Sequence, residues 1–127
     1  IRTTCFSLLS EGIGQTTLIV IVEKDNKIIG ASCGDSDAYL LKNDSIEHIT
    51  KNQQNIRVGD LSIPVFFEYN SFDKIIVGSD GLWRDCSIDF LANEIKINSD
   101  LDVIDIAFEK VSKYELQDDF SILIMSK

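Results

Sequence analysis

Short apolar stretches separated by polar turns fill the first two thirds of the chain. The stretch 17–23 is rich in β-branched residues, Asp25-Asn26 supplies a turn, and an apolar run resumes at 27–33, which is typical of a β-hairpin. The polar triplet Lys42-Asn43-Asp44 predicts a second hairpin in the same way. The strands that this pattern predicts are 17–23, 27–33, 37–42, 45–49, 64–68, 74–79 and 120–126.

Helical spacing of apolar residues comes later in the chain. Ser87 is typical of an N-cap, and the residues after it predict a helix over 87–97. A second helix is predicted over 100–114. Its apolar stripe is expected to contain Leu101, Ile104, Phe108 and Val111, widened by Val103, Ile106 and Ala107. Strands first, then helices, then a final strand favour an α+β fold in which an antiparallel sheet carries helices on one face.

Composition narrows the classes of function. The 127 residues suffice for one domain with a core, and no linker divides them. A net charge of −9 argues against a protein that binds nucleic acid or an anionic membrane. Cys5, Cys33 and Cys86 lack the spacing of a zinc site or a disulfide framework, which favours a reducing, cytoplasmic setting. No apolar run approaches the roughly 18 residues of a membrane span. Because the chain starts at Ile1 rather than Met, we expect it to be a piece of a longer protein.

Two apolar runs carry carboxylates at one end. Asp80 follows the run 74–78, and Asp118-Asp119 precede the run 120–125. Adjacent strands could aim these carboxylates at one point, where a hard dication such as Mg²⁺ or Mn²⁺ would neutralise them. Each motif also has a plain structural interpretation, because Asp80-Gly81 suits a turn and Asp118-Asp119 suits a solvated connector. The stretch 34–37, Gly-Asp-Ser-Asp, likewise suits a tight turn.

Taken together, the motifs resemble those of a known family. Residues 34–40, Gly-Asp-Ser-Asp-Ala-Tyr-Leu, resemble the Gly-Asp-Ser-Arg-Ala-Tyr-Leu motif of the metal-dependent type 2C serine/threonine protein phosphatases (the PPM family). Residues 79–83, Ser-Asp-Gly-Leu-Trp, and 118–121, Asp-Asp-Phe-Ser, are similar to two further motifs of that family. Residues 14–17, Gly-Gln-Thr-Thr, are similar to its Gly-Thr-Thr segment. The four motifs occur in the family's order.

The resemblance implies a role for each matching residue. The fold it implies is an antiparallel β-sandwich flanked by helices, incomplete at its N-terminus, with 1–127 as the C-terminal part of a single domain. Two divalent ions, Mg²⁺ or Mn²⁺, are expected in a complete domain, with Asp80 and Asp118 as metal ligands. Glu11 lies near the position where some members place an acid for a third metal. The supporting residues are expected to be Asp35, which lies under the site, Gly81 and Asp119.

The departures from the family pattern matter as well. Neither the family's phosphate-binding Arg nor its Asp-Gly-x-Gly-Gly segment has a match here, Asp37 stands in place of an Arg, and His48 is expected to be a solvated surface residue. The function implied is hydrolysis of phosphoserine or phosphothreonine in a phosphoprotein by metal-activated water, once the missing N-terminal half or a second chain completes the site. The isolated chain is expected to be inactive and could form homo-oligomers. The alternatives are a catalytically inactive, phosphatase-like binding or regulatory domain, and an unrelated α+β domain.

Overall fold

The computed structural model describes residues 16–53, 56–58, 63–113 and 119–127. The strands are β1 (Leu18–Lys24), β2 (Lys27–Cys33), β3 (Asp37–Lys42), β4 (Ser45–His48), β5 (Val65–Tyr69), β6 (Lys74–Gly78) and β7 (Ile122–Ser126). The helices are α2 (Asp80–Asp85), α3 (Ile88–Ile97) and α4 (Asp100–Val111). Every predicted strand and both predicted helices are present, which confirms the α+β fold.

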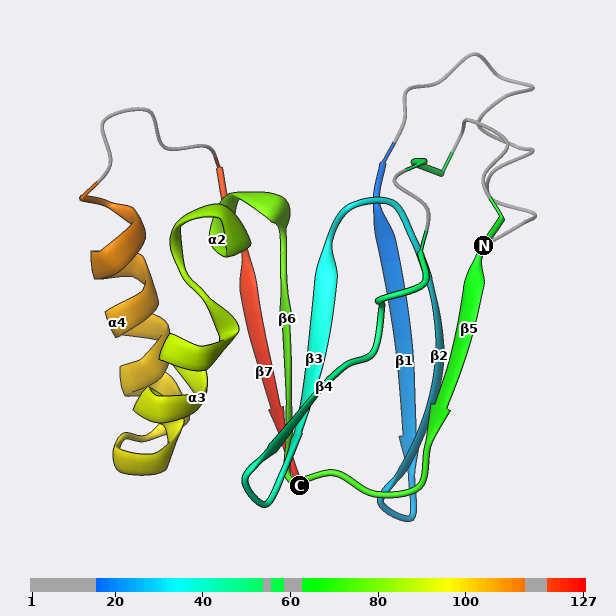
Figure 1. Cartoon of the computed structure of the whole chain (residues 1–127), viewed down its shortest axis with the longest axis horizontal. Helices are drawn as coiled ribbons and strands as arrows, with labels where there is room; N and C mark the ends of the chain where they lie inside the picture. The colour runs from blue at the N-terminus through cyan, green and yellow to red at the C-terminus, as the bar shows by residue number, and fades with distance from the viewer. Residues whose placement is uncertain (1–15, 54–55, 59–62, 114–118) are drawn as a thin grey trace.

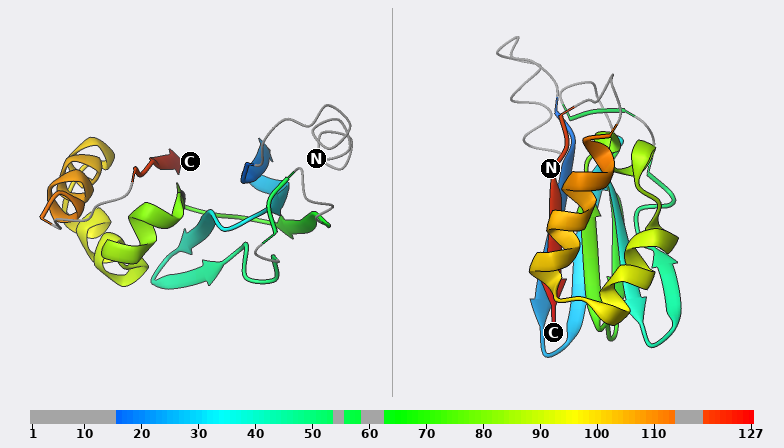
Figure 2. Two further views of the ribbon diagram at one scale, coloured as in Figure 1. Left: turned by 90° about the horizontal axis from the view of Figure 1, so that it is seen from above. Right: turned by 90° about the vertical axis from the view of Figure 1, so that its left-hand side faces the viewer.

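The strands form two antiparallel sheets that face each other (Figure 1). One sheet has the order β1-β2-β5 and the other the order β4-β3-β6-β7. Helices α2, α3 and α4 all lie against the second sheet, on the side away from the first (Figure 2). In the described part of the chain the layers are therefore sheet, sheet and helices, as the sandwich interpretation expects.

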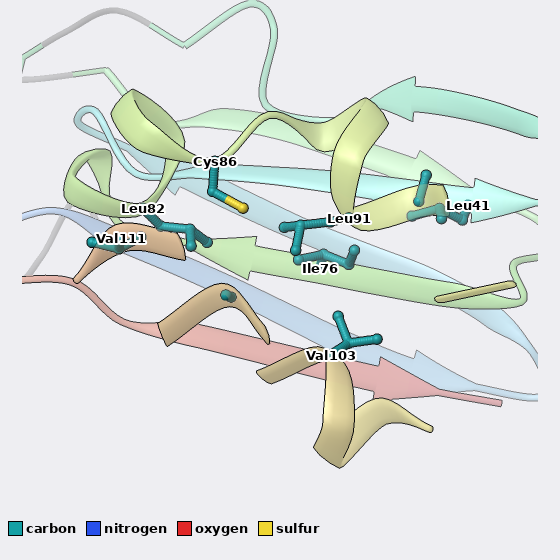
Figure 3. Close-up of a cluster of buried hydrophobic side chains, with 9 residues drawn as sticks. Leu41, Ile76, Leu82, Cys86, Leu91, Val103 and Val111 are labelled. Atoms are coloured by element: carbon teal, nitrogen blue, oxygen red, sulfur yellow. The ribbon is translucent and has the colours of Figure 1, made fainter. Parts of the chain in front are cut away.

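Alternation along the central strands supplies two cores. In β3, Leu40 points into the space between the sheets whereas Leu41 points toward the helices, and in β6 Ile75 and Ile76 divide in the same way. Toward the helices, Figure 3 shows Leu41 and Ile76 meeting Leu82, Cys86, Leu91, Val103 and Val111. Burial raises the pKa of the Cys86 thiol to about 11, so Cys86 is a neutral core residue and a poor nucleophile or metal ligand at neutral pH.

The two predicted turns form as the sequence indicates. Asp25 and Asn26 both have positive φ angles, 54° and 64°, and they join β1 to β2 in a two-residue hairpin. Asn43, with φ 54°, lies in the corresponding connection between β3 and β4. Asx side chains tolerate this left-handed region better than most residues do, which is why these positions mark the turns in the sequence.

Two details of the helices differ from the prediction. Helix α2 was not predicted, because Asp80-Gly81 also suits a turn and glycine disfavours a helix. In α4 the buried residues are Val103, Ala107 and Val111, whereas Leu101 is 70% exposed. All three buried residues belong to the predicted stripe as widened by Val103 and Ala107, but Leu101 does not share in the burial. No helix among the described residues is long and apolar enough to cross a membrane.

Candidate metal centre

The pairing of β6 with β7 brings the two acidic motifs together. Gly78 lies opposite Ile122 at the end of this strand pair. Beyond it, the Ser79 N–H donates to the Ser121 carbonyl at 3.2 Å, and the Ser121 N–H donates to Ser79 Oγ at 2.9 Å. Ser79 stands at the N-cap position of α2 without capping it, and its hydroxyl instead accepts the bond from Ser121, the residue before β7. The segments that carry Asp80 and Asp119 are thus fixed side by side.

Gly81 permits this close approach. A Cβ added at Gly81 would lie 2.5 Å from the Asp119 carbonyl oxygen and 3.2 Å from Phe120 Cβ. The first contact is with backbone and is far shorter than packed atoms tolerate, so a side chain here would push the two segments apart. Gly81 therefore has a structural reason to be glycine, which suits the supporting role expected of it.

The Asp80 carboxylate is available for a ligand. Asp80 is exposed at the start of α2, and its Oδ1 accepts a hydrogen bond from the Gly81 N–H at 2.9 Å. No lysine, arginine or histidine of the described residues forms an ion pair with Asp80. An exposed, hard oxygen donor at the end of a buried strand fits Mg²⁺ or Mn²⁺, which take oxygen ligands and keep several waters.

The other predicted ligands cannot be placed in the same way. Asp118 and Glu11 lie outside the described residues. Asp119 is described and exposed, next to the contact with Gly81. Within the described ranges, no three acidic, cysteine or histidine side chains gather closely enough to hold a metal ion. Of the three predicted metal ligands, only Asp80 therefore lies among the described residues.

Asp35 lies in the connection between β2 and β3, just before Asp37, which is opposite Gly78 of β6. Its carboxylate is 3.5 Å from the Arg57 guanidinium, and it follows Gly34, whose φ of 112° favours glycine. A Cβ at Gly34 would also lie 2.6 Å from Thr17 Cγ2. Gly34 is therefore packed against Thr17, just before β1, and the supporting role of Asp35 stays a prediction.

A polar cluster around Asp37 lies beside the candidate centre and was missed in the sequence. Asp37 Oδ1 accepts hydrogen bonds from His48 Nε2 at 2.8 Å, Thr50 Oγ1 at 2.7 Å and Gln53 Nε2 at 3.2 Å. Gln53 Nε2 also donates to the Ser36 carbonyl at 2.6 Å. The carboxylate thus ties the segment after β4 to the first residue of β3.

The prediction that His48 is a solvated surface residue was wrong. His48 is half-buried, its ring stacks on Tyr39 with 4.4 Å between centroids, and its Nε2 bonds Asp37. Burial, and secondarily the Asp37 charge, raise the pKa of Tyr39. The β3–β4 pairing sets Tyr39 opposite His48, and the segment after β4 then folds back so that Thr50 and Gln53 reach Asp37, which no local sequence pattern indicates.

Trp83 connects the Asp37 cluster to α2. Its Nε1 donates to the carbonyls of Gly78 at 3.0 Å and Asp37 at 3.2 Å, and its ring meets Tyr39 edge-on at 4.9 Å. Gly78 makes room for this ring, since a Cβ there would lie 2.9 Å from Trp83 Nε1. The Ser-Asp-Gly-Leu-Trp segment is thereby anchored to both β3 and β6, which fixes where Asp80 emerges.

Comparison with known proteins identifies this arrangement at the level of fold. No family model and no curated protein sequence matches the chain. Solved structures do match the chain. A bacterial serine phosphatase matches with a TM-score of 0.81 and 20% identity, and the match covers 98% of this chain and 66% of the phosphatase chain. Serine/threonine phosphatase Stp1 from Staphylococcus aureus matches with TM-score 0.81 and 20% identity, over 99% and 64%. The catalytic domain of PstP, in complex with two manganese ions, matches with TM-score 0.76 and 16% identity, over 97% and 65%.

The chain has the fold of part of a PPM-type Ser/Thr phosphatase domain. It spans 60–67% of the length of the solved phosphatases that it matches. The two sheets and the three helices therefore occur together as parts of one known fold. The identities, from 16% to 20%, establish the fold alone.

Proposed function

We propose that this chain is part of a metal-dependent phosphatase domain and supplies Asp80 and Asp118 to a two-metal site that hydrolyses phosphoserine or phosphothreonine in proteins. The observation that carries the proposal is the close approach of Gly81 to Asp119. A Cβ added at Gly81 would lie 2.5 Å from the Asp119 carbonyl oxygen. This close approach of Gly81 to Asp119 and Phe120 supports the proposal, because Asp80 and Asp118 are the direct neighbours of these contacting residues in the sequence. The two manganese ions in the PstP complex lend support, since PstP shares the fold.

Each residue has a definite part in this proposal. Asp80 and Asp118 would hold the divalent ions, Mg²⁺ or Mn²⁺, and Glu11 could serve a third. Two such ions, when bound, would lower the pKa of a water and neutralise charge on the phosphoryl oxygens. Gly81 would keep the ligand segments in contact, and Ser79 would bind β7 through its hydroxyl.

The proposal includes the setting of the protein. The substrate would be a phosphoprotein, because the matched solved structures are serine or serine/threonine phosphatases. The spacing of Cys5, Cys33 and Cys86, which fits neither a zinc site nor a disulfide framework, favours the cytoplasm. No match to the family's phosphate-binding Arg or Asp-Gly-x-Gly-Gly segment occurs in the 127 residues, so a further polypeptide would complete the site.

Activity should therefore depend on that further polypeptide. The test is a chimera in which this chain replaces the portion of Stp1 that it matches. The rest of Stp1, which has no counterpart in this chain, is called the complementing Stp1 segment. In the chimera this segment completes the domain. We expect Mn²⁺-dependent release of phosphate from phosphoserine and phosphothreonine peptides by the chimera, and turnover near background by the 127-residue chain alone. EDTA should abolish the activity.

The controls separate the alternatives. The complementing Stp1 segment expressed alone should be inactive. A folded chimera that binds Mn²⁺ but does not release phosphate would favour the inactive, phosphatase-like binding domain. Full activity of the isolated chain would contradict the proposal, because another set of residues would then complete the metal pair.

A further inference from the structure

Asp37 contacts two separate parts of the molecule. Its carboxylate holds the segment after β4, because Oδ1 accepts hydrogen bonds from His48, Thr50 and Gln53. Its main-chain carbonyl accepts a hydrogen bond from Trp83 Nε1 at 3.2 Å, and Trp83 lies on α2, whose first residue is the proposed metal ligand. One residue at the start of β3 therefore connects the segment after β4 to the helix at the metal centre (Figure 1).

The Asp37 carboxylate is held by a buried partner. Thr50 is 1% exposed, and its hydroxyl donates to Asp37 Oδ1 at 2.7 Å and accepts from the Ala38 N–H at 3.1 Å. Buried polar groups need such partners, so the positions of Asp37 and Thr50 restrain each other. Removal of the carboxylate would leave the buried hydroxyl without its acceptor, and the first residue of β3 would lose this restraint.

Aromatic rings provide a second connection from β4 to α2. The His48 ring stacks on Tyr39 with 4.4 Å between centroids, and Tyr39 meets Trp83 edge-on at 4.9 Å. The 2.8 Å bond between His48 Nε2 and Asp37 fixes the first ring of this series. Trp83 Nε1 also donates to the Gly78 carbonyl at 3.0 Å, so the indole is held by β3 and by the end of β6 together. Both connections restrain α2 through its tryptophan.

We propose that Asp37 is a positioning residue for the metal centre, which acts through Trp83 to set where α2 presents Asp80. The inference rests on the proposed function, in which Asp80 is a metal ligand. Residues that orient a metal ligand contribute about 10–100-fold to metal affinity without touching the ion. The role requires the acceptor oxygen of Asp37 rather than its charge, because three hydrogen bonds end at Oδ1.

Substitutions can separate the acceptor oxygen from the charge. Asp37→Asn keeps an acceptor oxygen and removes the charge, whereas Asp37→Ala removes both. His48→Ala removes one of the three bonds and the first ring of the series. The matched control is Asp73→Ala. The Asp73 carboxylate also holds a turn, by accepting from the Asn43 N–H at 2.7 Å, but Asp73 lies at the opposite end of β6 from α2.

Two measurements report the two ends of this connection. Trp83 is the one tryptophan of the 127 residues, so the fluorescence of the isolated chain reports the surroundings of its indole without metal or turnover. Electron paramagnetic resonance of free Mn²⁺ measures binding of the ion to the chimera with the complementing Stp1 segment, again without turnover. Far-UV circular dichroism and urea denaturation check that the variants are folded.

We expect Asp37→Ala and His48→Ala to shift the Trp83 emission to longer wavelength, because the loosened indole meets more water. Both should weaken Mn²⁺ binding, Asp37→Ala by at least about 10-fold. Asp37→Asn should recover most of the emission and of the affinity that Asp37→Ala loses. Asp73→Ala should change neither, even if it lowers the stability of the chain.

Equal Mn²⁺ affinity of the wild type and a folded Asp37→Ala chimera would overturn the inference. So would an Asp37→Asn chimera as weak as Asp37→Ala, since the charge would then act directly, or the same loss in Asp73→Ala. If Asp37→Ala does not fold, unchanged Mn²⁺ affinity of His48→Ala overturns the inference instead. A wild-type chimera that binds no Mn²⁺ would contradict the proposed function itself, and the inference with it.

Discussion

Replacing Asp80 by Asn in the chimera with the complementing Stp1 segment should lower Mn²⁺-dependent hydrolysis of p-nitrophenyl phosphate by about 100-fold or more. The amide keeps the shape of the carboxylate but removes the negative charge that a hard dication requires. Loss of about 3 kcal/mol of metal-based transition-state stabilisation corresponds to a rate about 100-fold lower. The measurement is kcat over a range of Mn²⁺ concentrations.

The matched control is Asp89→Asn. Asp89 is another exposed aspartate in the first turn of a helix, but it lies on α3, away from β7. Its replacement should leave the rate within about twofold of the wild type, since isolated surface charges contribute little. If Asp80→Asn retains the wild-type rate at saturating Mn²⁺, Asp80 is not a metal ligand and the site lies elsewhere.

The second large effect is expected from Gly81→Ala. A methyl group at this position would lie 2.5 Å from the Asp119 carbonyl oxygen, and relieving that clash moves backbone rather than a flexible side chain. Overpacking of this kind costs about 1–3 kcal/mol, whereas alanine gains up to about 1 kcal/mol over glycine in a helix. We therefore expect a net loss of about 1–2 kcal/mol in the free energy of unfolding, together with weaker Mn²⁺ binding.

Urea denaturation of the 127-residue chain measures the loss of stability, and Mn²⁺ titration of the chimera measures the effect on the site. Asn93→Ala serves as the control, because Asn93 is exposed on α3 and reports the helix-propensity gain by itself. A Gly81→Ala chain as stable as the wild type, with unchanged Mn²⁺ affinity, would show that the close contact between the two motifs is unimportant.

The strands could be predicted because their signals are local. β-branched runs and the Asp25-Asn26 and Asn43 turns specify hairpins that need no distant partner, and the structure has them at the predicted places. Helix α2 could not be predicted in this way, because Asp80-Gly81 has the local preferences of a turn and glycine disfavours a helix. Its formation depends on tertiary contacts: Leu82 is fully buried, and the Trp83 indole bonds two carbonyls of neighbouring strands.

The stripe of α4 shows a different limit. Leu101, Ile104 and Phe108 recur at spacings of three and four residues, and Val103 and Ala107 recur at a spacing of four. Periodicity alone therefore does not decide which of these two adjacent helix faces is buried. In the structure Val103, Ala107 and Val111 join the core cluster between the helices and the sheet, whereas Leu101 is 70% exposed. Phe108 is left 49% exposed but packs on Phe120, with 4.6 Å between ring centroids.

The position of a candidate site residue could be predicted where that residue directly follows or precedes a predicted strand. Asp80 lies where the sequence places it, at the end of a strand whose Ile75 and Ile76 are completely buried. The prediction that Asp118 faces it stays a prediction, since that residue lies outside the described part of the chain. The contacts of Asp37 with His48 and Thr50 could not have been derived, because they depend on how the segment after β4 folds back over β3.

The central claim is that the ends of β6 and β7 hold a divalent ion. Its most direct test is a crystal structure of the chimera grown with Mn²⁺, with anomalous differences recorded at the manganese edge. We predict an anomalous peak within about 2.0–2.6 Å of carboxylate oxygens of both Asp80 and Asp118. Ordered density for both carboxylates with no manganese peak between them, or a peak held entirely by residues of the complementing Stp1 segment, would contradict the account.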